Sequence, residues 1–290
     1  MAKSDFAKKR KQRIMSNFWT RTLSAVVFTA VMAFGLIWDR TLFGALFLVI
    51  LWIALQEFYR MALGTRFQLQ QKLALVAGAL AFFFVACHFF YGWSLAWLVL
   101  PFLTLLLIPV SCLLLPSREG FGELSILYVG LLYVALPIAL APIVVMDGEV
   151  YDGWQLLSLF IIIWLSDVGA YCLGTAFGQG PKARKLAPSI SPKKSWWGFW
   201  SGLVFGMGAA VALYYLGWLQ YGLGHCIALG AIVSAGGVCG DLYESMWKRH
   251  FGVKDSGKCI PGHGGMLDRF DSSLVAIPLA YIYLAIIDLL

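Results

Sequence analysis

Long apolar runs separated by short polar segments recur along almost the whole chain. A bilayer core of about 30 Å requires about 20 apolar residues in a helix, so the pattern predicts about nine transmembrane helices. Helices are expected because hydrocarbon offers the backbone no hydrogen-bond partner, and continuous runs are unlike the alternation of a barrel. The predicted spans are Thr22–Trp38, Leu42–Phe58, Leu73–Phe90, Leu95–Leu115, Leu124–Met146, Trp154–Phe177, Trp196–Leu216, His225–Cys239 and Leu274–Leu289.

The composition agrees with an all-α polytopic membrane protein, because 60% of the residues are hydrophobic and only 13% are charged. Three parts are expected. A basic amino-terminal segment covers residues 1–21, amino-terminal transmembrane helices cover 22–153, and a carboxyl-terminal transmembrane region covers 154–290. The first apolar run resembles a signal peptide, but its length and the spans that follow favour an uncleaved helix.

The basic residues predict the orientation. With the amino terminus in the cytoplasm and nine alternating spans, 21 of the 22 Lys and Arg residues fall on the cytoplasmic side, and only Arg40 does not. This is the positive-inside bias of membrane proteins. It places the carboxyl terminus on the opposite side and residues 245–271 at the cytoplasmic face. The formal charge of +7 therefore has a topological use, and no nucleic-acid partner is expected.

Small residues recur at four-residue spacing in the last third of the chain. They are Gly202, Gly206 and Ala210 in one span, and Gly236 and Gly240 in the next. Such spacing allows helices to approach closely. We therefore expect a tight carboxyl-terminal bundle with charged loops at its inner end.

Two acidic residues occur within or at the end of apolar spans. Asp167 lies inside the sixth span, and intramembrane carboxylates are usually paired or functional. We expect it at the wall of a cavity, interacting with a lysine. Glu57 lies at the inner end of the second span near Arg60, and we expect an ordinary interfacial ion pair at i, i+3.

A polar stripe extends the eighth span. Asp241, Glu244, Ser245 and Lys248 stand at positions i, i+3, i+4 and i+7, so they share one face if the segment stays helical. Such a stripe on a membrane helix is expected to face a wet cavity or a site. The alternative is a helix end that is simply solvated.

A glycine-rich segment follows, Gly262-His263-Gly264-Gly265. Glycine allows backbone amides to approach an anion, although a plain turn would use the same residues. Asp268, Arg269 and Asp271 come immediately afterwards. Hard carboxylates suit Mg²⁺, and Mg²⁺ together with Lys or Arg suits a polyphosphate.

The segment Ser245–Asp271 resembles the signature of the phosphatidate cytidylyltransferases, also called CDP-diacylglycerol synthases. The shared order is Ser-x-apolar-Lys-Arg, Lys-Asp-Ser-Gly and Pro-Gly-His-Gly-Gly-apolar-x-Asp-Arg-apolar-Asp. Two upstream segments, Trp164–Gly178 and Leu186–Trp196, are also similar to the family. One departure is Trp197, where the family usually has glutamate. The resemblance covers roughly residues 160–290.

The resemblance implies transfer of a cytidylyl group from CTP or dCTP to phosphatidic acid, which gives CDP-diacylglycerol and pyrophosphate. It implies Mg²⁺ held by Asp241 and Asp268, with Asp271 and Glu244 beside them or on a second metal ion. Lys248, Arg249, Lys258 and Arg269 would bind phosphate charge, and Gly262, Gly264 and Gly265 would cradle the triphosphate. Ser245, Asp167, Lys193 and Lys194 complete the predicted substrate contacts.

Some of these roles have plainer alternatives. Lys193 and Lys194 could serve topology alone, and His263 could be structural rather than a donor to phosphate. The resemblance further implies a homodimer in a bacterial inner membrane, with the site facing the cytoplasm. The membrane lipid bilayer itself is the remaining expected partner.

Two other classes of protein compete with this interpretation. A transporter or channel would also use intramembrane Asp167, Asp241 and Glu244. However, inverted-repeat transporters show two corresponding halves, and none is evident here. A different CTP-using lipid enzyme, such as a polyprenol kinase or a synthase for archaeal-type lipids, is the third candidate. The match over Ser245–Asp271 favours the phosphatidate enzyme.

Overall fold

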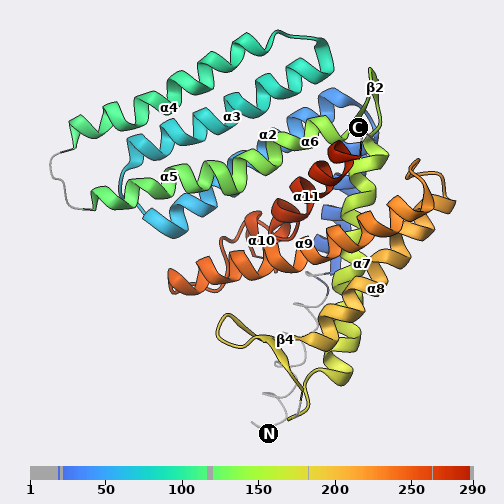
Figure 1. Cartoon of the computed structure of the whole chain (residues 1–290). Helices are drawn as coiled ribbons and strands as arrows, with labels where there is room; N and C mark the ends of the chain where they lie inside the picture. The colour runs from blue at the N-terminus through green and yellow to red at the C-terminus, as the bar shows by residue number, and fades with distance from the viewer. Residues whose placement is uncertain (1–18, 20–21, 116–119, 182, 263, 288–290) are drawn as a thin grey trace, which may run out of the picture.

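The chain is an all-α polytopic membrane protein in the computed structural model (Figure 1). The structure describes residues 19, 22–115, 120–181, 183–262 and 264–287. In these ranges eight helical segments are long and apolar enough to cross a bilayer, and a shorter apolar helix covers Thr22–Ile37. The long segments are Arg40–Leu63, Gln68–Tyr91, Leu95–Leu114, Phe121–Val144, Gly153–Phe177, Trp196–Tyr215, Leu223–His250 and Leu267–Ile286.

Five of the long segments are single α-helices, namely α2 (Arg40–Leu63), α3 (Gln68–Tyr91), α7 (Gly153–Phe177), α8 (Trp196–Tyr215) and α9 (Leu223–His250). The other three are composite. In the first, α4 (Val99–Ser111) lies between two short 3₁₀ turns, Leu95–Leu98 and Cys112–Leu114. The second comprises a 3₁₀ turn (Phe121–Leu124), α5 (Ser125–Gly130), a π-helical stretch (Leu131–Ala135) and α6 (Leu136–Val144). The last joins α10 (Leu267–Phe270) and α11 (Ser273–Ile286).

All nine predicted apolar runs coincide with these helices, and the number of membrane crossings stays a prediction. Two boundaries differ in a way that affects the site. α9 continues without a break to His250, as the polar stripe requires. The last span was expected from Leu274 but begins at Leu267, because Leu267 and Phe270 are buried and continue its apolar face. Asp268 and Asp271 therefore lie on or next to helix rather than in a loop.

Short polar side chains define several helix starts. Asp39 accepts a hydrogen bond from the Thr41 amide (2.7 Å), and Asp152 accepts one from Trp154 (2.9 Å). Ser195 does the same for Gly198 at the start of α8 (3.2 Å). Each side chain satisfies an amide that has no partner within its own helix.

The helices form two neighbouring groups, which Figure 1 shows most clearly for α3, α4 and α5 on one side and α7, α8 and α9 on the other. α7 packs on α8, α8 on α9, and α9 on α11. α11 also contacts α6, so the last helix joins the two groups. The carboxyl-terminal group is the tight bundle that the sequence predicts.

Small residues bring the helices of this bundle together. A Cβ atom on Gly206 would overlap Ser234 of α9, and one on Gly202 would be tightly packed against Ser166 and Ala170 of α7. Gly236 contacts Ala276 of α11. The four-residue spacing of small residues therefore serves helix packing, as predicted.

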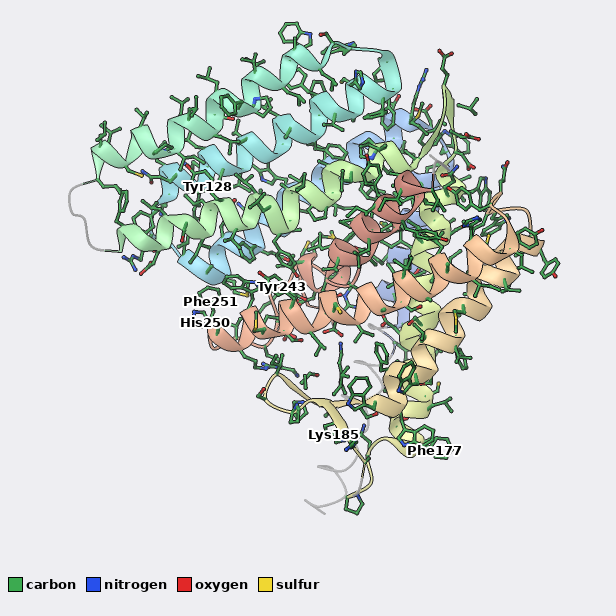
Figure 2. The ribbon with its side chains drawn as sticks, in the orientation of Figure 1. Tyr128, Phe177, Lys185, Tyr243, His250 and Phe251 are labelled. Atoms are coloured by element: carbon green, nitrogen blue, oxygen red, sulfur yellow. The ribbon has the colours of Figure 1, made fainter. Side chains whose placement is uncertain are left out.

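A β-hairpin connects α7 to α8. Its strands are β3 (Lys185–Ala187) and β4 (Ser191–Ser195), which pair antiparallel. Lys185 donates hydrogen bonds to the Gly178 carbonyl (2.9 Å) and to Gln179 Oε1 (2.7 Å), and so fixes the hairpin to the end of α7. Figure 2 shows Lys185 on this hairpin and Phe177 at the adjoining helix end. A second, two-residue hairpin, β1 (Met146–Asp147) with β2 (Val150–Tyr151), joins α6 to α7.

Candidate active site

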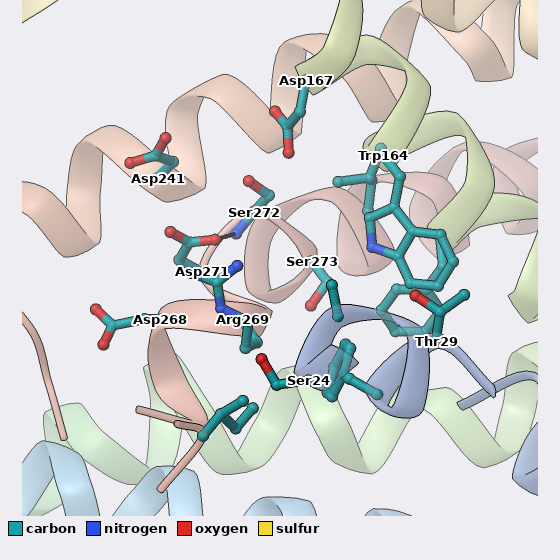
Figure 3. A pocket seen from close by; sticks show the side chains of 15 residues that line it. Ser24, Thr29, Trp164, Asp167, Asp241, Asp268, Arg269, Asp271, Ser272 and Ser273 are labelled. Carbon is teal, nitrogen blue, oxygen red and sulfur yellow. Dashed lines mark hydrogen bonds between the residues drawn. The ribbon is translucent and has the colours of Figure 1, made fainter. Parts of the chain in front are cut away.

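An acidic cavity of about 330 Å³ lies where the helix Thr22–Ile37, α7, α9 and α10 meet. Asp167 extends into it from α7 and Asp241 comes from α9, while Asp268, Arg269 and Asp271 come from the α10 segment (Figure 3). The resemblance implied that Asp241 and Asp268 lie close enough to share a metal ion, and both residues line this one cavity. We call it the acidic cavity.

The polar stripe of α9 faces the protein interior. Ser245 donates a hydrogen bond to Asp241 (3.2 Å), and Lys248 donates one to Glu244 (3.1 Å). Glu244, Ser245 and Lys248 are buried, whereas Asp241 is partly exposed to the cavity. Among the described residues, Oε1 of Glu244 has no hydrogen-bond partner. Asp241 lines a cavity, and the other three residues of the stripe are buried rather than solvated. A functional role of the stripe stays a prediction.

Asp268 ties three segments together. Its Oδ1 accepts a hydrogen bond from Lys248 (2.8 Å), and its Oδ2 accepts from the amides of Ser256 (2.9 Å) and Gly265 (2.7 Å). Lys248 thus lies within ion-pair distance of two carboxylates, Glu244 and Asp268. Both oxygens of Asp268 are engaged by the protein, so this side chain positions the loop from residue 256 to 265 in the present arrangement.

Phe270 anchors the segment that carries the acidic residues. It is almost completely buried and lies edge-on to Phe28, Phe47 and Phe160, which come from three different helices. Edge-to-face aromatic pairs of this kind add to the apolar burial. The anchored ring fixes α10, and its two neighbours, Arg269 and Asp271, are thereby held at the acidic cavity.

A second cavity of about 600 Å³ is formed by the glycine loop. Lys254, Lys258 and Arg269 line it together with Gly262 and Gly264, and Asp255 is the acidic residue on its wall. Gly262 and Gly264 have φ angles of 77° and 85°, which residues with a side chain rarely adopt. Arg269 lines this loop cavity and the acidic cavity alike, so the two adjoin. His263 lies outside the described residues.

A third cavity, also about 600 Å³, lies between the β3–β4 hairpin, α7, α8 and α9. Lys193 and Lys194 line it beside apolar residues that include Tyr171, Leu186 and Phe199. Asp167 and Asp241 line this lysine cavity and the acidic cavity alike. Lys194 forms an ion pair with Asp241 (2.6 Å). Asp167 lies at a cavity wall as expected, but no ion pair joins it to a lysine in the described ranges.

Other predicted residues lie apart from the cavities. Arg249 is exposed and donates a hydrogen bond to the Val253 carbonyl (3.1 Å). Lys248 and Ser245 are buried behind Asp241, and the Gly265 amide is directed at Asp268. Trp197, at the position where the resemblance expects a glutamate, is exposed and packs against Phe177. The structure therefore gathers Asp167, Lys193, Lys194, Lys258 and Arg269 around the three cavities and leaves Arg249 outside them.

The prediction of an interfacial ion pair between Glu57 and Arg60 is wrong. Glu57 is buried, and its Oε2 accepts hydrogen bonds from the Leu267 amide (2.9 Å) and from the Ser256 hydroxyl (3.3 Å). Partial burial, and after it the charge of Glu57, raise the pKa of the nearby Cys259 thiol. Spacing to Arg60 suggested a local pair, whereas a lone carboxylate in an apolar span was the signal that pointed to an interior role.

Carboxylate oxygens of the acidic cavity are the candidate ligands for Mg²⁺. No group of three His, Cys, Asp or Glu side chains within the described ranges is close enough to hold a metal ion. Mg²⁺ typically binds one or two carboxylates and completes its octahedron with water and substrate phosphate. Asp241 and Asp271, which line the same cavity, fit that requirement.

Comparison with known proteins places these observations in a family. The model of the Cytidylyltransferase family matches residues 19–287. A phosphatidate cytidylyltransferase of Staphylococcus aureus (strain COL) is 46% identical over 131 residues, which are 44% of this chain and 48% of that protein. The phosphatidate cytidylyltransferase of Staphylococcus haemolyticus (strain JCSC1435) is 36% identical over 168 residues, 58% of this chain and 62% of that protein.

The aligned part spans only about half to three-fifths of the length of these curated relatives. The family model, by contrast, extends from the first described residue, Trp19, to the end of the last described helix. It includes all three cavities. The chain belongs to the cytidylyltransferase family.

Proposed function

We propose that the protein transfers the cytidylyl group of CTP to phosphatidic acid and releases pyrophosphate. The observation that carries this proposal is the series of three adjoining cavities. The loop cavity offers basic side chains and glycine backbone for a triphosphate, and the lysine cavity offers cations beside an apolar wall for a lipid phosphate. The acidic cavity joins them. The names of the staphylococcal relatives agree with these substrates.

The reaction follows from this arrangement. A phosphate oxygen of phosphatidic acid attacks the α-phosphorus of CTP, the bond from that phosphorus to the bridging oxygen breaks, and pyrophosphate leaves with the bond's electron pair. Phosphoryl-type transfer of this kind relies on positioning and charge stabilisation rather than on a protein nucleophile. Lys194 and Lys193 would hold the acceptor phosphate. Arg269, at the boundary of two cavities, would bind the phosphates between which the bond breaks.

Asp241 and Asp271 would hold Mg²⁺, which supplies charge neutralisation to the phosphates when bound. The resemblance implied Asp241 and Asp268 as the primary ligands, with Asp271 and Glu244 beside them or on a second metal ion. Because Asp268 accepts three hydrogen bonds from Lys248 and two amides, we assign it the role of bracing the loop. Glu244, with one oxygen free of partners in the described ranges, stands behind Asp271 as the candidate for a second metal ion.

The orientation and the cellular setting belong to the same proposal. The basic residues favour the cytoplasmic side for the hairpin and the glycine loop, where CTP is available. The bacterial relatives favour the plasma membrane of a bacterium. The homodimer implied by family resemblance is retained as a proposal, and the cavities described here are formed by one chain.

The test is a product assay with purified full-length protein in lipid nanodiscs. CTP or dCTP, Mg²⁺ and a panel of phosphorylated lipids are supplied, and the liponucleotide and pyrophosphate are measured. We expect CDP-diacylglycerol from phosphatidic acid. Phosphorylation of an unphosphorylated polyprenol would indicate the kinase alternative. No liponucleotide from any lipid, in protein shown to be folded, would reject the proposed function.

A further inference from the structure

We infer that Glu57 of α2, in the amino-terminal half of the chain, positions the glycine loop for the nucleotide. The inference rests on the proposed function for the identity of the nucleotide, but the contacts stand independently. The resemblance on which the site was first predicted begins near residue 160, so Glu57 lies about a hundred residues before it. Its partners lie between residues 256 and 267.

The contacts of Glu57 reach both ends of the loop. Oε2 accepts from the Ser256 hydroxyl on the incoming side and from the Leu267 amide on the outgoing side. The Leu267 amide belongs to the first turn of the last span and has no acceptor within its own helix. Glu57 therefore supplies an acceptor from a different helix to an otherwise unsatisfied donor.

Two glycines leave room for this carboxylate. A Cβ atom on Gly257 would overlap the Glu57 carboxylate, and one on Gly265 would overlap Glu57 Oε2 as well as the Ser256 hydroxyl. Neither glycine is in the left-handed region, so neither is required by a positive φ angle. Their lack of a side chain is explained by the close approach of Glu57.

Asp268 is a second carboxylate that holds the same two segments of the loop. It accepts from the amides of Ser256 and Gly265, whereas Glu57 accepts from the Ser256 hydroxyl and the Leu267 amide. Glu57 and Asp268 thus hold the two ends of the loop whose described residues line the loop cavity, namely Gly257, Lys258, Ile260, Pro261, Gly262 and Gly264. The negative charge of Asp268 is compensated by an ion pair with Lys248. Glu57 has no Lys, Arg or His within ion-pair distance in the described part of the chain, and its charge is stabilised by these hydrogen bonds alone.

The inference is tested by three variants of full-length protein in nanodiscs. Glu57→Ala removes both contacts, Glu57→Gln keeps an acceptor oxygen without the charge, and Ser256→Ala removes one contact only. A positioning role predicts that Glu57→Ala raises KM for CTP about tenfold or more while KM for phosphatidic acid changes by less than about threefold. Glu57→Gln should have a KM for CTP close to that of the wild type. Ser256→Ala should have a KM for CTP between those of the wild type and Glu57→Ala. Glu123→Gln, which loses an exposed ion pair in the same half of the chain, is the matched control.

A second readout does not depend on activity. Cys259 lies in the loop and is exposed, so its rate of modification by a maleimide reports how firmly the loop is held. The other exposed cysteines, Cys172 and Cys239, are first changed to serine. Both Glu57 variants remove the negative charge that raises the pKa of Cys259. The two variants therefore differ only in the hydrogen bonds that hold the loop. If Glu57 positions the loop, Cys259 should be labelled faster in Glu57→Ala than in Glu57→Gln.

The outcomes separate the two proposals. Equal labelling of the alanine and glutamine variants, with unchanged KM for CTP, would overturn the positioning role of Glu57. If Glu57→Ala does not fold, Ser256→Ala decides, because it removes a contact of Glu57 and keeps the Glu57 charge. Labelling of Cys259 and KM for CTP at the wild-type values in Ser256→Ala would then overturn the positioning role. If the wild-type protein makes no liponucleotide, the proposed function fails. The labelling comparison then still decides whether Glu57 holds the loop.

Discussion

Lys194 of the β3–β4 hairpin and Asp241 of α9 form an ion pair with 2.6 Å between Nζ and Oδ2, at the boundary of the lysine cavity and the acidic cavity. Both side chains are partly accessible. In the proposed reaction each has a second partner, because the lysine would bind lipid phosphate and the carboxylate would bind Mg²⁺. In the substrate-free protein, the ion pair compensates the charges of both side chains.

The first prediction concerns this lysine. Lys194→Ala should raise KM for phosphatidic acid at least about tenfold, because a charge-assisted hydrogen bond contributes roughly 1.5–3 kcal/mol. Lys194→Arg should retain most activity, since it keeps the charge. Lys193→Ala should have the smaller effect, because Lys193 makes no ion pair in the described ranges. Steady-state rates at varied lipid content measure all three, and equal losses at both lysines would contradict the assigned difference.

The second prediction separates metal binding from loop positioning. Asp241→Asn should lose most activity at ordinary Mg²⁺ and regain part of it when Mg²⁺ is raised about tenfold or more, because a weakened site refills by mass action. Asp268→Asn should also lose activity but should not respond to Mg²⁺. Asparagine has one acceptor oxygen, whereas Asp268 accepts hydrogen bonds from Lys248 at one oxygen and from two amides at the other, so the variant loses part of this network. Recovery of Asp268→Asn at high Mg²⁺ would return Asp268 to the metal site.

The third prediction uses two glycines of the same helix. A Cβ atom on Gly240 would overlap the backbone of Asp271 and Ser272, whereas one on Gly224 would meet nothing within 4 Å. Gly240→Ala should therefore displace Asp271 and lower both turnover and thermal stability. Overpacking of this kind costs about 1–3 kcal/mol. Gly224→Ala should be neutral or slightly stabilising, since alanine favours helix. Thermal unfolding and turnover of both variants give the comparison.

The fourth prediction concerns orientation. In protein with Cys172 and Cys239 replaced by serine, native Cys259 should react with a membrane-impermeant maleimide only after cells are opened. Glu149→Cys lies in the exposed β1–β2 hairpin, which the proposed topology places on the external side of the membrane, and it should react in intact cells. The expectation follows from the distribution of basic residues. Reaction of Cys259 in intact cells would reverse the proposed topology.

The sequence predicted the parts of this molecule that depend on local pattern. Apolar runs of helical length located the spans, and the spacing of Asp241, Glu244, Ser245 and Lys248 predicted a shared inward face that α9 shows. The spacing of Gly202 and Gly206 likewise predicted close packing. In each case the relevant residues lie within one helix, so their relative placement follows from helix geometry.

Contacts between distant segments could not be predicted in the same way. Glu57 was assigned to Arg60, three residues away, but it bonds to Ser256 and Leu267, about two hundred residues later. Arg249 and Lys248 are neighbours with equal charge, yet one is exposed and the other is buried between two carboxylates. Periodicity indicates which face a residue occupies. It does not indicate which other helix that face meets.

The position of the lysine cavity has a kinetic consequence. Its wall includes Tyr171, which is 72% exposed on the apolar surface of the bundle, so an acceptor lipid would arrive by diffusion within the membrane sheet. The nucleotide would arrive by diffusion through water. On the proposed function, the rate should then follow the mole fraction of acceptor among the surrounding lipids. Diluting the vesicles in buffer should leave it unchanged, while diluting the acceptor with neutral lipid should lower it.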